Sequence, residues 1–117
     1  MDIVELREYC ISKPHSSEGF PFGQDVLVFK VAGKMFALCS IDAPNPSVNL
    51  KCDPEKAEEL RELHPEITAG YHMHKRMWNT VSLQGRLSDA FIRGLIDHSY
   101  EEVVKSLTLK KRRELGL

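Results

Sequence analysis

Histidine, cationic and aromatic side chains are concentrated in residues 71–78, which read Tyr-His-Met-His-Lys-Arg-Met-Trp. Lys75 and Arg76 are suited to pairing with phosphates, and Trp78 offers a ring on which a base can stack. A strand buried in a core needs no such density of imidazole and positive charge. The segment therefore indicates a surface that binds an anionic partner, although it specifies no reaction.

Each side chain of this segment also has an ordinary structural role to set against binding. In a half-buried strand either Met77 or Trp78 must face the core, so packing is the favoured role for Trp78. Lys75 and Arg76 fit a solvated turn as well as an anion contact, and the sequence leaves both alternatives open.

His72 and His74 could begin a metal site, because side chains two residues apart project from the same side of an extended segment. A stable site requires three or four ligands, and the sequence offers only His64 and Cys52 as distant third candidates. We therefore expect the histidine pair to be polar surface, with no metal and no other cofactor.

Further cations lie elsewhere in the chain. Lys110-Lys111-Arg112-Arg113 could contact phosphates, or could be a solvated terminus whose charges favour a helix end. Lys30 and Lys51 have the strand parity that would place both on the outer face of a sheet. Net charge is −5 over residues 1–66 and +4 over residues 67–117, so a polarised molecule could present one basic face. The candidate nucleic-acid-binding residues are Lys30, Lys51, His72, His74, Lys75, Arg76, Trp78, Lys110, Lys111, Arg112 and Arg113.

Catalysis has little support in the sequence. No phosphate-binding glycine motif is present, and no strained turn surrounds Ser16, Ser17 or Ser99. Asp97 and His98 are neighbours in a predicted helix, where their side chains diverge by about 100°. We expect no catalytic residues and no enzyme.

Length and composition indicate one domain spanning residues 1–117, large enough for a core. Cys10, Cys39 and Cys52 have no short spacing, which favours buried, reduced thiols over a disulfide framework or a zinc knuckle. The acidic start of the chain does not resemble a secretory segment, and no apolar run approaches the ~20 residues that a membrane span needs. A cytoplasmic location is therefore expected.

The first half of the chain predicts a helix, a loop and three strands. Asp2 caps a helix that runs to about Ser12, before Lys13-Pro14. Residues 15–23 form a predicted loop with Phe20 and Phe22 tucked inward. Residues 25–41 alternate as a β-hairpin turning at Gly33, and residues 47–51 form a third strand.

The second half predicts two helices around a further strand. Asp53-Pro54 begins a helix that ends at about His64, residues 67–75 are irregular, and residues 76–83 form a strand. Ser88 caps a long helix, in which Gly94 suggests a packing constraint, and residues 109–117 hold a short last helix. This order predicts an α+β fold, a two-layer α/β sandwich with an antiparallel sheet.

Several segments resemble the YjbR (MmcQ/YjbR) family of small bacterial proteins. The similar segments are 10–14 (Cys-Ile-Ser-Lys-Pro), 20–23 (Phe-Pro-Phe-Gly), 29–37, 48–54, 70–73 (Gly-Tyr-His-Met) and 78–81 (Trp-Asn-Thr-Val), with Lys75, Asp97, Ser99 and Tyr100. The resemblance implies a frataxin-like (CyaY-like) fold and a DNA-binding protein. We expect double-stranded DNA as the partner and no membrane contact. His74 departs from the family, which commonly has asparagine there. The alternatives are a protein-interaction or regulatory domain, or weak metal binding through His72 and His74.

Overall fold

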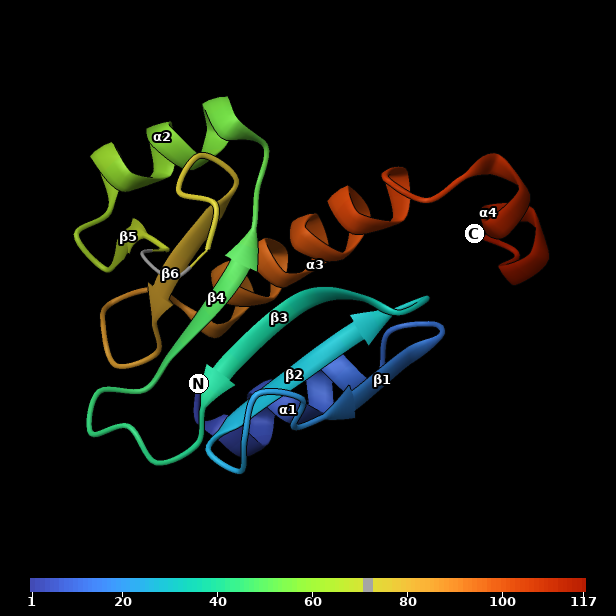
Figure 1. Ribbon diagram of the computed structural model, residues 1–117. Helices are drawn as coiled ribbons and strands as arrows, with labels where there is room; N and C mark the ends of the chain where they lie inside the picture. Colours follow the sequence, from blue (N-terminus) through green and yellow to red (C-terminus); the bar gives the residue numbers. More distant parts are fainter. Residues whose placement is uncertain (71–72) are drawn as a thin grey trace.

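The structure is a computed structural model that describes residues 1–70 and 73–117 (Figure 1). The described residues form four helices and six strands. Their bounds are α1 Ile3–Ile11, β1 Ser16–Gly19, β2 Val26–Val31, β3 Lys34–Ser40, β4 Ser47–Lys51, α2 Pro54–Leu63, β5 Ile67–Ala69, β6 Trp78–Ser82, α3 Asp89–Lys105 and α4 Leu109–Leu115. The predicted α+β class is confirmed.

The strands form one antiparallel, open sheet in the order β1-β2-β3-β4-β6-β5. Apolar residues of α1, α2 and α3 join the inner-face residues of the strands in one core that includes Phe29, Phe36 and Ile96. A smaller cluster of Val28, Leu38 and Trp78 lies on the opposite, outer face. The helices therefore cover one face of the sheet and leave the outer face open.

The local signals that predicted these elements are seen in the structure. Asp2, Asp53 and Ser88 each accept a hydrogen bond from the backbone N–H three residues later, as N-cap residues do. The β2–β3 hairpin turns through Ala32 (φ 50°) and Gly33 (φ 80°), two positive values that a two-residue type I′ loop requires.

The predictions for the two edges of the sheet were wrong. The loop expected over residues 15–23 contains β1, and the irregular segment 67–75 contains β5. Phe20 and Phe22 were expected inside but are 50% and 63% exposed. Residues 20–25 connect the end of β1 to the start of β2, and both rings lie with residues of the outer face and not with the core.

Ser99 joins α3 to the middle of the sheet. Its buried hydroxyl donates a hydrogen bond to the Phe36 carbonyl (2.5 Å) and accepts one from the Lys51 amide (2.8 Å). The hydroxyl therefore links a backbone carbonyl of β3 to a backbone amide of β4. In the described part of the chain these strands pair directly at Ala37 with Leu50 and at Leu38 with Asn49.

A polar network fastens the end of α1 to α3. The Tyr9 hydroxyl donates to Asp97 (2.6 Å), Lys13 forms an ion pair with the same carboxylate, and the Tyr100 hydroxyl donates to the Pro14 carbonyl. Burial alone would raise the pKa of Asp97, but the hydrogen bonds and the charge of Lys13 outweigh it and leave this pKa lowered. Lys13, Asp97 and Tyr100 therefore have structural roles in this fold.

Gly94 has no packing role, contrary to expectation. It lies on the exposed face of α3, and a Cβ built on it meets no heavy atom within 4 Å. Gly94→Ala is therefore expected to raise the free energy of unfolding by about 1 kcal/mol, since alanine reduces the entropy lost when the helix forms. Urea denaturation measures the change, and a decrease would reveal a hidden constraint at this position.

Candidate nucleic-acid interface

Most of the candidate cationic residues lie at one end of the sheet. The strands β2 and β4 end there, and β3 and β6 begin there, because Val31 pairs with Lys34 and Lys51 pairs with Trp78. Lys34 at the start of β3 donates to Ser106 at the end of α3, which places α4 at the same end. We call this region the basic end.

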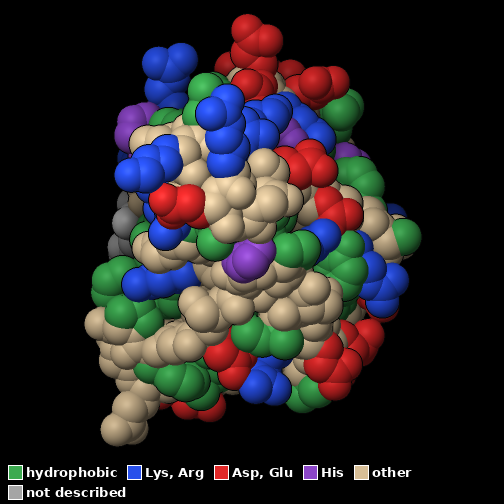
Figure 2. Space-filling model, turned by 90° about the vertical axis from the view of Figure 1, so that its right-hand side faces the viewer, with side chains coloured by type: hydrophobic (Ala, Val, Ile, Leu, Met, Phe, Trp, Pro, Cys, Tyr) green, Lys and Arg blue, Asp and Glu red, His purple; other side chains and the backbone are tan. Residues whose placement is uncertain are grey.

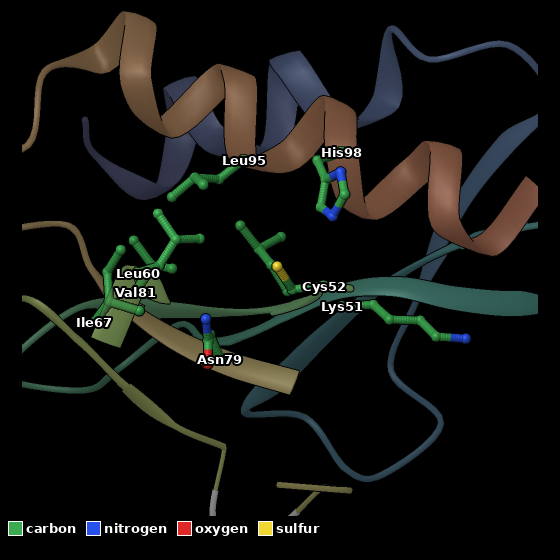
Figure 3. Close-up of a pocket in the computed structure, with 9 residues that line it drawn as sticks. Lys51, Cys52, Leu60, Ile67, Asn79, Val81, Leu95 and His98 are labelled. Atoms are coloured by element: carbon green, nitrogen blue, oxygen red, sulfur yellow. The ribbon is translucent and has the colours of Figure 1, made fainter. Parts of the chain in front are cut away.

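Lys30 and Lys51 reach the basic end from the outer face. Lys30 lies opposite Met35 and Lys51 opposite Trp78, both of which contribute to the outer cluster. Figure 3 shows the Lys51 side chain directed away from the interior. Neither lysine forms an ion pair within residues 1–70 and 73–117, and each is partly exposed. The predicted parity of these two residues is therefore correct.

The segment 73–77 holds two more cations beside Trp78. Lys75 and Arg76 are exposed, and the Arg61 guanidinium of α2 donates to the Lys75 carbonyl (2.9 Å). The same guanidinium donates to the side chain of Asn79, which is buried and donates in turn to the Ala57 carbonyl. The fold therefore attaches this segment to α2 through Arg61.

Of the predicted pair His72 and His74, the structure describes His74. His74 is exposed, and its carbonyl accepts the amides of Met77 and Trp78 at 3.0 Å. His72 lies outside the described residues. Within residues 1–70 and 73–117 no group of three His, Cys, Asp or Glu side chains could hold a metal ion.

The helix α4 carries the last group of candidate residues. Lys110, Lys111 and Arg113 are exposed, whereas the Nε atom of Arg112 is buried without a hydrogen-bond partner. Figure 2 views the molecule from the side on which α4 lies, and Lys and Arg side chains gather in the upper part of that view, with Asp and Glu among and above them. Three of the four tail cations are therefore available to solvent at the basic end.

Carboxylates weaken the positive field in part of this region. Glu114 lies 3.8 Å from Lys111, and Glu102 lies 3.4 Å from Lys105. Such exposed pairs contribute little to stability, but each carboxylate reduces the local positive charge. Lys30, Lys51, Arg76, Lys110 and Arg113 have no recorded ion pair in the described part of the chain.

Trp78 does not offer a stacking surface. Its side chain is 8% exposed and packs with Val28 and Leu38, with Met73 and Met77 against the cluster. Trp78 therefore has the packing role that the strand pattern favoured, and we no longer consider it a candidate contact residue. Sequence reasoning missed Phe20 and Phe22 instead, because it placed both in the core. No sequence signal marked them, because residues 16–19 lack an apolar alternation and β1 is defined by its pairing with β2.

The pocket beside Cys52 and His98 is too small to hold a substrate. A pocket between α3 and the sheet, lined by Cys52, Leu60, Asn79 and His98 among others, has a cavity volume of about 10 Å³, sufficient for no more than one water molecule (Figure 3). Burial raises the pKa of Cys10 to about 12 and those of Cys39 and Cys52 to about 11, so all three thiols are poor nucleophiles.

His98 instead helps to begin α2. Its Nε2 atom accepts the backbone N–H of Asp53 at 3.2 Å, which requires that this nitrogen carry no proton. Burial, and to a lesser degree the charge of Lys56, lowers the pKa of His98, while Glu102 and Glu101 oppose the shift. The folded state therefore favours the neutral imidazole.

Stability should consequently fall on acidification. The pKa of His98 is lower in the folded state than its unfolded value of 6.5. His98 therefore contributes fully to the free energy of unfolding above pH 6.5, and this contribution is lost as pH falls through the lower folded-state pKa. We expect the free energy of unfolding to drop between pH 7 and pH 5, and His98→Gln to show a smaller drop. Urea titrations at both pH values measure this, and an equal drop in the variant would assign the pH dependence to other groups.

The comparisons with known proteins agree on one family. The YjbR family model matches residues 11–102, which is most of the chain. The chain belongs to the YjbR family. The *Escherichia coli* protein YjbR, described as uncharacterized, is 36% identical over 115 residues that cover 98% of each chain. YbdF from the same species, also described as uncharacterized, is 38% identical over 82% of this chain and 79% of its own.

Solved structures of relatives share the fold. A crystal structure from *Deinococcus radiodurans* is 42% identical and superimposes with a TM-score of 0.93, covering 99% of this chain and 88% of that one. A crystal structure from *Pseudomonas syringae* is 28% identical with a TM-score of 0.76, covering 87% and 98% of the two chains. No helix in the described residues is long and apolar enough to cross a membrane.

Proposed function

We propose that this YjbR-family protein binds DNA without catalysing a reaction, and that its basic end contacts the phosphates. One observation carries the proposal: cations from β2, β4, the 73–77 segment and α4 lie at the same end of the sheet. Among them, Lys30, Lys51, Arg76, Lys110 and Arg113 form no ion pair within the described residues. Positive side chains held together in this way attract a polyanion even when net charge is only −1. The frataxin-like classification and the cytoplasmic location stay predictions.

The test uses a fluorescent DNA duplex with a single-stranded overhang, so that binding to either form is detected. Affinity measured by anisotropy should fall steeply from about 50 to 200 mM salt, because bound phosphates release counterions. The double variant Lys30→Glu/Lys51→Glu should bind at least tenfold more weakly at low salt, and should reduce the log–log salt slope by about 2.

A matched control separates the site from net charge. Arg86→Glu/Arg93→Glu makes the same change in total charge on exposed residues of the loop before α3 and of the first half of α3. This control should bind nearly as well as the unmodified protein. Equal weakening by both double variants would refute the basic end as the binding site, and no binding of the probe at 50 mM salt would refute the proposed function.

A further inference from the structure

The outer face of the sheet contains an apolar hollow that extends from Met35, near the basic end, to Val26 at the opposite end of the strands. Side chains of β2 and β3 form its floor, and its walls come from the 20–25 loop and the 73–77 segment. It is lined mainly by Phe22, Val26, Met35, Leu38, Asn49 and Met73, and has a volume of about 370 Å³. The Phe22 ring is 63% exposed at its rim. Solvent-facing aromatic and methionine side chains around a hollow of this size are typical of a binding surface.

A second hollow adjoins the first across β2. It is lined by Phe20, Pro21, Val28 and Lys30, with Ser17 and Gly19 of the edge strand β1. Phe20 is 50% exposed, and Val28 belongs to the outer cluster that also forms the floor of the first hollow. The two exposed phenylalanines therefore stand over neighbouring strands on one open face.

Positive charge accompanies these hollows. Lys30 lines the second hollow, and Lys51 lies two strands away on the same face, about 10 Å across the sheet at the usual strand spacing. Glu18 also lines the second hollow, but its carboxylate receives two hydrogen bonds from the Arg7 Nε atom, at 2.8 and 3.1 Å, and a third from the same guanidinium. Its charge is therefore compensated by Arg7.

This arrangement of hollows and cations suits a single nucleic-acid strand better than a DNA duplex. A DNA duplex presents phosphates but keeps the faces of its bases stacked inside, so it would gain nothing from an apolar hollow. A single strand presents unstacked, flat base faces together with a regular line of phosphates. Aromatic rings beside cations on an open sheet face are the pattern that binds such a strand.

We infer that the ligand of this surface is single-stranded nucleic acid, whose bases occupy the two hollows against Phe20 and Phe22 while Lys30 and Lys51 contact its phosphates. The inference rests on the proposed function and narrows its ligand class. It also assigns a role to the two rings that lie outside the core.

The test compares a labelled single-stranded oligonucleotide with its fully paired duplex at one salt concentration. The single strand should bind at least tenfold more tightly. Phe20→Ala/Phe22→Ala should weaken single-strand binding by about tenfold or more, since each stacked base contributes substantially, and should leave duplex binding unchanged. Both residues are exposed, so the variant should keep the thermal stability of the unmodified protein.

Val4→Ala/Leu63→Ala is the control, because these side chains are 63% and 65% exposed and belong to α1 and α2. It should leave single-strand affinity unchanged. Equal binding of single strand and duplex, or unchanged affinity in the phenylalanine variant, would overturn the inference. The proposed function would still stand if Lys30→Glu/Lys51→Glu weakened binding in either case, whereas failure of both DNA forms to bind would remove both proposals.

Discussion

Replacing Ser99 with alanine is expected to lower the free energy of unfolding by about 3 kcal/mol, because it leaves two buried backbone groups without partners. The hydroxyl is fully buried and binds both the Phe36 carbonyl and the Lys51 amide. Each unsatisfied group costs roughly 1–3 kcal/mol, and the lost oxygen leaves space that packing does not refill. The effect should exceed that of most single substitutions.

Urea denaturation of Ser99→Ala against Ser106→Ala provides the measurement and its control. Ser106 ends the same helix, and its hydroxyl donates to the Val103 carbonyl near solvent. Its loss should therefore cost less than about 1 kcal/mol. A similar small loss in Ser99→Ala would mean that β3 and β4 close directly on each other, or that water replaces the hydroxyl.

Asn79→Ala is the second large effect we expect, a loss of about 2 kcal/mol. The Asn79 amide is 2% exposed, donates to the Ala57 carbonyl (3.3 Å) and accepts from Arg61 (3.2 Å). Its removal leaves the Arg61 guanidinium with one acceptor fewer inside a partly buried site. Because Arg61 also holds the Lys75 carbonyl, backbone amides of residues 73–77 should exchange with deuterium faster in the variant.

Asn49→Ala is the matched control. Asn49 accepts a hydrogen bond from Thr80 on the outer face. Within the described residues its side chain forms no hydrogen bond to α2 or to the 73–77 segment. It should lose less stability and leave exchange at residues 73–77 unchanged. If Asn79→Ala behaved like Asn49→Ala, the attachment of this segment would depend on other contacts.

Strong local signals made most of the fold predictable. The start of α2 follows from Asp53-Pro54, and β4 was predicted with the bounds that the structure has, Ser47–Lys51. The edge strands β1 and β5 were not predictable in this way. They have four and three residues, and neither has an apolar alternation, so only pairing with a neighbouring strand defines them.

The candidate site was predictable only in part, because some of its residues are positioned by contacts between separate elements. Parity placed Lys30 and Lys51 on one face, because alternation is a property of the strand itself. The roles of Phe20, Phe22 and Ser99 depend on where separate elements meet in space. Local spacing carries no information about such contacts, and so the hollows and the link between β3 and β4 could be seen only in the folded chain.

The composition of the outer face also makes the proposed ligand surface sensitive to oxidants. All three cysteines are buried with raised pKa values, so the folded chain presents little thiolate to peroxide. Met35 and Met73 are partly exposed around the apolar hollow. Conversion of either thioether to a sulfoxide would introduce a polar, chiral group into that hollow, so methionine oxidation would alter the proposed ligand surface directly.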